Sequence, residues 1–374
     1  MNRLLALSTL AFLLSAAPVS APSGMDTARL ARIPVRMKSL VDSGQIAGAV
    51  DLIARNGTIV FHEAVGFQDL ESRKPMRKDS IFQIMSMTKP VTGVAIMMLM
   101  EEGKLSINDP VEKYLPEFKD KMVAEKSESG EVKLRRPSRP ITIRDLMTHT
   151  SGMEAAQGEF KDIMVKMDRK LSEAVAHYAK EPLGFDPGTK WLYSNTGIAT
   201  LGRLIEVLSD QPYEVFIAER LLKPLGMKDS FFFPPADKID RIALNYVRKD
   251  GNLVRAPVTS LGGDSALYRK GAVYSGPEHG LYSTATDLAA FYQMMANGGT
   301  LNGRRYLSPY SVEVMTSVHT GELRAGHLAG TGFGLTWEVV KDPIGTVTLL
   351  SPGTFGHGGA FNTHGWVDRK KNLI

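Results

Sequence analysis

The sequence of 374 residues contains no cysteine. This absence excludes disulfide bonds, zinc–thiolate sites and a lipid-anchoring cysteine. The chain must rely on its core, and its length suffices for a sizeable core in one large domain or two. Its hydrophobic content of 43% and charged content of 23% are those of an ordinary globular protein.

Motifs for metal and nucleotide binding are also missing. No H-E-x-x-H occurs, and His357 and His364 lack the spacing of metal ligands. The run from Gly330 to Gly334 departs from the G-x-G-x-x-G dinucleotide fingerprint. There is no G-x-S-x-G either, which argues against an α/β-hydrolase nucleophile elbow. We therefore expect neither a metal nor another cofactor.

Positive charge is in only mild excess, with 45 basic and 40 acidic residues spread along the chain. The densest basic cluster, residues 133–139, is short and has no interleaved aromatic residues, so a solvated hairpin explains it better than a nucleic-acid site. We expect a small-molecule substrate and no nucleic-acid partner. The composition indicates no particular oligomeric state.

A long apolar run stands at the N-terminus. Arg3 is followed by an apolar stretch from Leu4 to Ala17, and Val19-Ser-Ala21 offers small residues for cleavage. Residues 1–21 are therefore predicted to be a secretory signal peptide, too short for a membrane span, and no later segment is long and apolar enough to be one. We expect a periplasmic or secreted bacterial protein.

The spacing of apolar residues predicts helices and strands in a definite order. Asn56-Gly57 joins two alternating runs and is the strongest short hairpin signal. Helical spacing dominates the middle of the chain, loops dominate residues 224–280, and strand-like runs return near the end. The expected helices span 26–42, 87–100, much of 152–220 and 285–295, and the expected strands span 47–54, 59–66, 334–340, 346–350 and 364–367.

This order predicts an α/β (α+β) fold in which an antiparallel sheet is flanked by helices. The sheet domain is expected to combine residues 22–82 and 320–374. A mainly helical domain, residues 83–319, is expected to be inserted between them, with the active site at the interface.

A serine and a lysine three residues apart form the first candidate site. Ser86 and Lys89 stand where a long apolar helix begins, so their side chains face the same way. A serine is a poor nucleophile unless a base takes its proton, and Lys89 can be that base only when neutral. Lowering a lysine pKa to near 7 costs roughly 4 kcal/mol. A helix end supplies only about 0.3–2 kcal/mol, so burial must supply the rest.

Tyr193-Ser-Asn195, the second candidate site, precedes another predicted helix. One interpretation is structural, with Asn195 or Thr196 as the helix cap and Tyr193 as a packed aromatic. The other is catalytic, because a tyrosine oxygen close to a neutral Lys89 can relay the serine proton to the leaving group. Lys89 and Tyr193 would then titrate as one coupled unit.

The third candidate is the glycine-rich run from His357 to Ala360. Its small residues would let the backbone pass close to a substrate, and a backbone N–H here could complete an oxyanion hole with that of Ser86. A glycine-rich turn between two strands explains the same run without a function.

With these three motifs in this order, the chain resembles the serine β-lactamase and penicillin-binding protein superfamily, most closely its class C-like branch with the family VIII carboxylesterases. The likeness spans almost all of residues 26–374 and includes segments 146–152, 187–197, 222–227 and 280–287. It implies Ser86 as the acylated nucleophile and Lys89 with Tyr193 as the base pair. It also implies an oxyanion hole from the N–H groups of Ser86 and Ala360, and substrate contacts from Asn195, His357, Gly358 and Gly359.

The third motif departs from the pattern of this superfamily. Its β-lactamases and transpeptidases carry K-T-G, whose lysine helps to hold the substrate's carboxylate, whereas His357 stands there in this chain. Because histidine is mostly neutral near pH 7, the clamp on an anionic β-lactam should be weaker. The H-G-G form is like that of the esterases, so we expect hydrolysis of short-chain carboxylic esters with slow β-lactam turnover.

Two other functions stay open at this point. One is a β-lactamase, or a D-amino peptidase or DD-carboxypeptidase, acting on β-lactams or peptidoglycan, which the export signal favours. The other is a non-catalytic penicillin- or peptidoglycan-binding module, which would form no covalent adduct at Ser86.

Residues 368–372 have the composition of a hairpin turn, and Leu373-Ile374 resemble the start of another strand. Proteins of the superfamily continue through that strand into a helix that packs on the sheet. We therefore expect the native chain to be longer, and the given chain to leave an unpaired edge and an uncovered apolar face.

Overall fold

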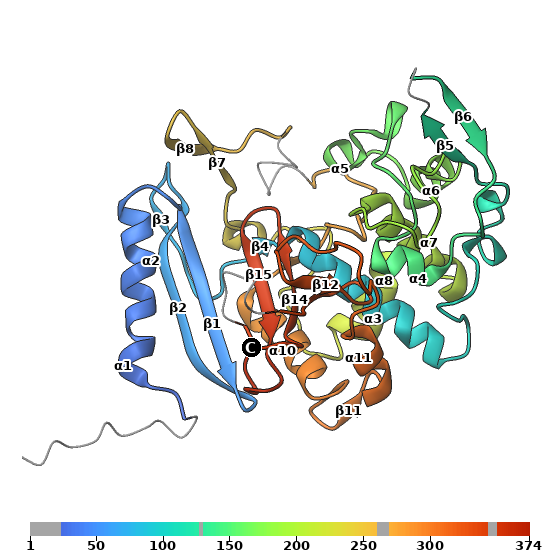
Figure 1. The fold of residues 1–374 in the computed structure, drawn as a ribbon. Helices are drawn as coiled ribbons and strands as arrows, with labels where there is room; N and C mark the ends of the chain where they lie inside the picture. The colour runs from blue at the N-terminus through green and yellow to red at the C-terminus, as the bar shows by residue number, and fades with distance from the viewer. Residues whose placement is uncertain (1–23, 127–129, 260–268, 343–349) are drawn as a thin grey trace, which may run out of the picture.

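The computed structural model describes residues 24–126, 130–259, 269–342 and 350–374 (Figure 1). The predicted signal peptide and most of the predicted strand 346–350 lie outside these ranges. The α-helices are α1 (Thr27–Leu30), α2 (Arg32–Asp42), α3 (Thr88–Glu101), α4 (Ile143–Thr148), α5 (Ile163–Lys166), α6 (Leu171–Tyr178), α7 (Asn195–Ser209), α8 (Tyr213–Ile217), α10 (Ala285–Ala296) and α11 (Pro309–Met315).

The strands are short except for the first two, and those in the described ranges pair within six small antiparallel sheets. They are β1 (Gly48–Arg55), β2 (Thr58–Asp69), β3 (Lys74–Pro75), β4 (Phe82–Gln83), β5 (Val123–Lys126), β6 (Val132–Arg135), β7 (Tyr246–Lys249), β8 (Asn252–Arg255), β9 (Tyr282–Ser283), β10 (Thr300–Leu301), β11 (Arg304–Arg305), β12 (Thr331–Phe333), β13 (Glu338–Val340), β14 (Phe355–Gly359) and β15 (Thr363–Val367).

The N-terminal hairpin forms as predicted. Strands β1 and β2 pair from Gly48 opposite Gly66 to Arg55 opposite Thr58. Asn56 and Gly57 turn the chain with φ of 51° and 78°, the left-handed pair that a two-residue hairpin of this type requires. Helices α1 and α2 lie along the outer side of this hairpin (Figure 1).

Helix α3 is the centre of the core. Every residue from Thr88 to Leu99 is buried, as expected for a helix that is apolar on nearly all sides. Gly93 lets the turn at Thr336 lie close to α3, because a Cβ on residue 93 would be 2.0 Å from the Thr336 hydroxyl. In the helical middle of the chain, α7 and α8 pack against α3, and α4 packs against α7 (Figure 1).

Strands β12, β13, β14 and β15 form an antiparallel sheet in this order. The predicted strand 334–340 is wrong in its first half: residues 334–337 turn the chain between β12 and β13, with Thr336 at a φ of 67°. The chain's last residue also pairs with β1, through hydrogen bonds between Ala54 and Ile374 in both directions (2.9 and 3.0 Å). A cavity of about 1060 Å³ lies between the β1–β2 hairpin and α2 on one side and β15 and α10 on the other.

Three further hairpins, β5–β6, β7–β8 and β10–β11, lie in the described part of the chain. The solvated hairpin expected from the basic cluster is confirmed in part: residues 133–135 lie in β6, which pairs with β5 and is mostly exposed, whereas residues 136–139 follow the strand. Hairpin β7–β8 was not predicted, although Asp250-Gly251 at its turn is a hairpin signal. The architecture is mixed α/β, with antiparallel sheets and helices. Within the described ranges, no helix combines the length and apolarity needed to cross a membrane.

Candidate active site

Ser86 lies in a single 3-10 turn, Met85–Met87, immediately before α3. Its neighbour Met85 is buried at a φ of 49°, a left-handed conformation that is uncommon for a residue other than glycine. The turn leaves the Ser86 side chain half-buried at the helix N-terminus, where the first N–H groups have no partner within the helix. This position suits a nucleophile whose reaction generates an oxyanion.

Lys89 reaches back one turn to Ser86. Its Nζ lies 3.0 Å from Ser86 Oγ and donates to the main-chain oxygen of Glu278 at 2.7 Å. The side chain is fully buried. Burial lowers the pKa of Lys89 to about 7, and the negative charge of Glu278 acts in the opposite direction. The amine can therefore be neutral near pH 7, as a base for Ser86 must be.

Tyr193 completes this group. Lys89 Nζ lies 4.6 Å from the centre of the Tyr193 ring. Burial raises the pKa of the Tyr193 phenol above its ordinary value, against the opposing effect of the Ser86 side chain. The phenol is therefore protonated near pH 7, so it can pass a proton on only by receiving another. The structure brings the three residues together as the sequence predicted.

His149 holds Tyr193 in place, a contact that sequence reasoning missed. Its carbonyl oxygen accepts from Leu192 N (2.9 Å), and its Nδ1 accepts from Ser194 N (3.1 Å), so it binds the backbone on both sides of the tyrosine. The rings of His149 and Tyr193 are 4.6 Å apart. His149 lies within segment 146–152, which carried the resemblance, but nothing in the spacing assigned it a partner.

His357 lies on β14 and is buried, with 1% of its surface exposed. Its Nδ1 is 2.7 Å from the carbonyl oxygen of Gly358. A carbonyl oxygen only accepts, so Nδ1 must carry the ring proton. Burial, followed by the charge of Lys89, lowers the pKa of His357 to about 3. The other nitrogen, Nε2, is therefore an unprotonated acceptor, and it has no hydrogen-bond partner among the described residues.

The glycines after His357 bring β14 against the residues before Ser86. A Cβ on Gly359 would lie 2.3 Å from the carbonyl oxygen of Ile84, and that oxygen accepts from Thr363 Oγ1 at 3.0 Å. A Cβ on Gly358 would meet the His364 ring at 2.9 Å. The stretch is thus a strand ending in a tight hairpin, and both glycines are needed for its close approach. Ala360 follows, exposed at the hairpin tip.

Asn195 is the first residue of α7, and it is not the helix cap. Ser194 caps the helix, with its Oγ accepting from Gly197 N at 3.0 Å, so the expectation that Asn195 or Thr196 is the cap is wrong. Asn195 Nδ2 lies 3.6 Å from Met164 Sδ, and Oδ1 is buried with no hydrogen-bond partner among the described residues. The amide is therefore not committed to capping.

Aromatic side chains surround Tyr193. The ring centres of His327 and Trp191 lie 4.8 and 6.3 Å from that of Tyr193, and Phe333 lies 5.7 Å from Trp191. His327 is exposed. Trp191 lies within segment 187–197, which carried the resemblance, whereas no motif marked His327 and Phe333, because they come from a distant segment that meets Tyr193 only in the fold. In the described part of the chain, no group of three or more His, Asp or Glu side chains is arranged to hold a metal ion.

Comparison with known proteins identifies the family. The family model described as beta-lactamase matches residues 36–374. The chain belongs to the beta-lactamase family. Esterase EstB of Burkholderia gladioli is 30% identical to it over 93% of this chain and 90% of the esterase.

Solved structures share the beta-lactamase fold. EstCE1, a hydrolase with promiscuous acyltransferase activity, has a TM-score of 0.76 at 24% identity and covers 92% of this chain and 91% of its own. The octameric penicillin-binding protein homologue from Pyrococcus abyssi has a TM-score of 0.69 at 25% identity, over 93% of this chain and 72% of its own. This beta-lactamase-family protein is a serine hydrolase, as the family and its esterase relatives show.

Proposed function

We propose that this serine hydrolase cleaves short-chain carboxylic esters through an acyl-enzyme on Ser86. The observation that carries the proposal is the state of His357, whose only uncommitted nitrogen is an acceptor. A carboxylate also only accepts, so it gains no hydrogen bond and no opposite charge from this ring. A neutral ester needs no such clamp. The esterase name of EstB, 30% identical, supports the same choice.

The proposed acylation uses the contacts at Ser86. Neutral Lys89 takes the hydroxyl proton as Oγ forms a bond to the ester carbonyl carbon, and the N–H groups of Ser86 and Ala360 stabilise the oxyanion. The tetrahedral intermediate then breaks its bond to the leaving alkoxide. Tyr193 donates its proton to that alkoxide and is reprotonated by Lys89, which returns the pair to its initial state.

Deacylation repeats the steps with water in place of serine. The Lys89–Tyr193 pair removes a proton from water as its oxygen attacks the acyl carbon, and the proton passes to Ser86 Oγ when the acid leaves. Asn195 would accept a hydrogen bond from substrate; the proposal is supported by its buried amide oxygen, which has no hydrogen-bond partner among the described residues.

The alternative is a β-lactamase or a D-amino peptidase or DD-carboxypeptidase. It is supported by the likeness to a penicillin-binding protein homologue and by the predicted export signal at residues 1–21, which would deliver the protein to the cell wall. In this case another cation must replace the missing K-T-G lysine.

A substrate panel tests the proposal. We expect kcat/KM on p-nitrophenyl butyrate to exceed that on cephalosporins and on D-Ala-D-Ala peptides, and Ser86→Ala to abolish turnover of all three. Equal or faster cephalosporin turnover would reject the esterase assignment in favour of the alternative. A wild-type protein that gives no burst of product and no covalent adduct with a fluorophosphonate would be a binding module.

A further inference from the structure

A tight turn, residues 275–281, lies against the first turns of α3 directly behind Lys89. Three successive contacts tie it to the helix: Pro277 O accepts from Thr92 Oγ1 (2.7 Å), Glu278 O accepts from Lys89 Nζ (2.7 Å), and Leu281 N donates to Thr88 Oγ1 (3.1 Å). The main chain at Glu278 is therefore fixed relative to the helix that carries Lys89.

The turn is also packed from its other sides. A Cβ on Gly280 would lie 1.8 Å from Ser275 O, and a Cβ on Gly202 of α7 would lie 2.2 Å from the Pro277 ring. The guanidinium of Arg269 donates to Gly280 O at 3.0 Å. Because the turn is packed this closely, it cannot shift away from Lys89 when the charge on Glu278 changes. Lys89 therefore experiences the change in charge directly.

The Glu278 side chain carries a buried carboxyl group, with 1% of the residue exposed. Tyr274 donates to Oε1 at 2.9 Å, and His279 Nδ1 lies 3.2 Å from the same oxygen. Oε2 has no hydrogen-bond partner among the described residues. A carboxylate in this setting is only partly compensated by its neighbours, so its field reaches the nearby ammonium of Lys89 with little screening.

The titratable groups around this pair come from several elements. Lys89 faces His149 of the α4 C-terminus, Tyr193 before α7 and His357 of β14, in addition to Glu278 and His279 of the turn. Glu278 acts on the tyrosines 178, 193, 213 and 274, and Arg269 acts on His279. Of the acidic residues in the described chain, Glu278 is the one whose charge raises the pKa of Lys89.

We propose that Glu278 is a positioning residue for acylation: its carbonyl oxygen holds the Lys89 amine beside Ser86, and its buried carboxylate, supported by His279, controls the protonation of that amine. The inference rests on the proposed role of Lys89 as the base for Ser86. It assigns a function to a carboxylate that neither binds substrate nor contacts the serine.

The charges act in a definite direction. Burial alone would raise the pKa of Glu278, but the charge and proximity of His279, with a smaller contribution from Lys89, lower it below its ordinary value. The carboxylate therefore stays ionised near pH 7 and favours the protonated form of Lys89. Removing the negative charge should lower the pKa of Lys89 further, which leaves more neutral amine at acidic pH.

Glu278→Gln tests the inference, because the amide keeps the shape and an acceptor for Tyr274 but removes the charge. The second-order rate of Ser86 phosphonylation by a fluorophosphonate, measured from about pH 5 to about pH 9, reports the base without a substrate. We expect the midpoint of the acid limb to fall by about one pH unit. Asp287→Asn is the matched control. The buried Asp287 carboxylate accepts hydrogen bonds from the main-chain N–H of Asp229 and from Ser230 Oγ, and the acid limb of this variant should match that of the wild type.

A second pair of variants decides the case if Glu278→Gln does not fold. His279→Leu removes the imidazole whose Nδ1 lies 3.2 Å from Glu278 Oε1, and it should move the acid limb in the same direction. His279→Asn returns a polar N–H group near that oxygen and should restore the limb. The inference would be overturned if the acid limbs of these two variants had the same midpoint. It would also be overturned if a folded Glu278→Gln protein kept the wild-type midpoint.

Parallel pH profiles of p-nitrophenyl butyrate hydrolysis separate this inference from the proposed function. If Glu278→Gln shifts the acid limb of Ser86 phosphonylation but the wild type does not hydrolyse the ester, the role of Glu278 is supported and the esterase function is not. Ester turnover with an unmoved limb overturns the role of Glu278 and leaves the esterase standing.

Discussion

Two buried lysines, Lys89 and Lys121, differ in what their amines contact. Burial lowers the pKa of both, to about 7 for Lys89 and about 8 for Lys121. Lys121 donates to the carbonyl oxygens of Tyr178 (3.0 Å), Ala179 (3.2 Å) and Glu181, at the C-terminal end of α6. Lys89 instead contacts one carbonyl and the hydroxyl of Ser86.

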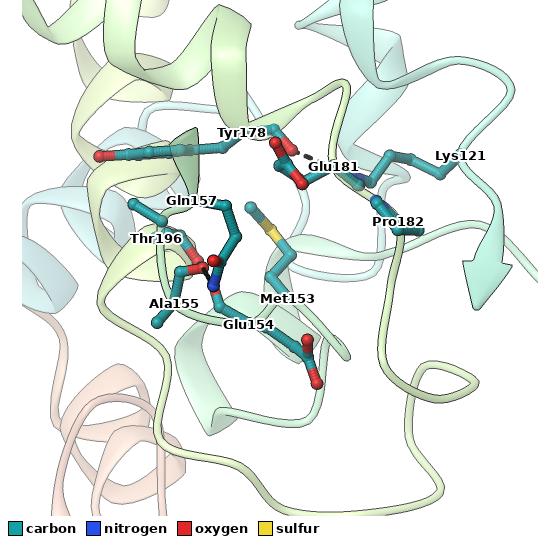
Figure 2. A pocket seen from close by; sticks show the side chains of 10 residues that line it. Lys121, Met153, Glu154, Ala155, Gln157, Tyr178, Glu181, Pro182 and Thr196 are labelled. Atoms are coloured by element: carbon teal, nitrogen blue, oxygen red, sulfur yellow. Dashed lines mark hydrogen bonds between the residues drawn. The ribbon is translucent and has the colours of Figure 1, made fainter. Parts of the chain in front are cut away.

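Figure 2 shows the surroundings of Lys121, beside a cavity of about 50 Å³. On the opposite side of this cavity, Thr196 donates to the carbonyl oxygen of Glu154 at 2.7 Å. All three N–H bonds of the Lys121 ammonium have acceptors, and the negative end of the helix dipole favours its charge. A lowered lysine pKa therefore does not identify a base. The contact with a hydroxyl that can give up a proton does.

The largest effect should come from Lys89→Met. Methionine fills similar space but cannot take a proton, so we expect kcat/KM on p-nitrophenyl butyrate to fall by about 10²–10⁴-fold. The free energy of unfolding should stay the same or rise, because a buried charge is removed. Urea unfolding and ester kinetics on the same preparation measure both. Retained activity would contradict the assignment of Lys89 as the base.

Lys121→Met should have the converse effect. It leaves three carbonyl oxygens at the end of α6 without their donor, which should lower the free energy of unfolding by roughly 1–3 kcal/mol. The value of kcat/KM should not change, since no contact within the described ranges links Lys121 to Ser86. A fall in kcat/KM in a folded Lys121→Met protein would show that the two lysines do not differ as their contacts indicate.

A lysine placed at position 357 extends the comparison to the substrate. His357→Lys replaces an acceptor with a donor that carries a positive charge, so we expect the ratio of kcat/KM on cephalosporins to that on p-nitrophenyl butyrate to rise about tenfold. His364→Lys, on the neighbouring strand and exposed, is the control. An unchanged ratio in a variant that still reacts with fluorophosphonate would mean that position 357 does not select between these substrates.

The comparison also shows what a sequence reveals about such a site. Ser86 and Lys89 were predictable because a helix fixes the geometry of residues three apart. The hairpin at Asn56-Gly57 was predictable because only certain residues adopt left-handed turns at low cost. Tyr193 and His357 were predicted as site residues from the motifs that contain them.

The contacts of His149 and Glu278 were not predictable, because they are separated by 45 and 189 residues from the groups they bind. Such contacts depend on how helices and turns pack, and no local pattern records that packing. The prediction of the α7 cap failed for a local reason. Ser194, Asn195 and Thr196 are all residues that can cap a helix, and in the structure Ser194 is the cap. The predicted domain boundaries and the longer native chain stay predictions.

The most discriminating effect is the dependence of stability on pH. Both folded lysines have a pKa below their ordinary value of 10.5, so between the folded value and 10.5 the unfolded chain binds more protons than the folded one. The free energy of unfolding therefore rises with pH in this window, by up to about 1.4 kcal/mol per pH unit for each lysine.

Relative to each Met variant, the wild type should gain stability above about pH 7 for Lys89 and above about pH 8 for Lys121. Only the first gain should coincide with the acid limb of ester hydrolysis, because only Lys89 contacts the nucleophile. Urea unfolding at a series of pH values, set beside the activity profile, measures this, and an acid limb that moves in Lys121→Met would refute the division of roles.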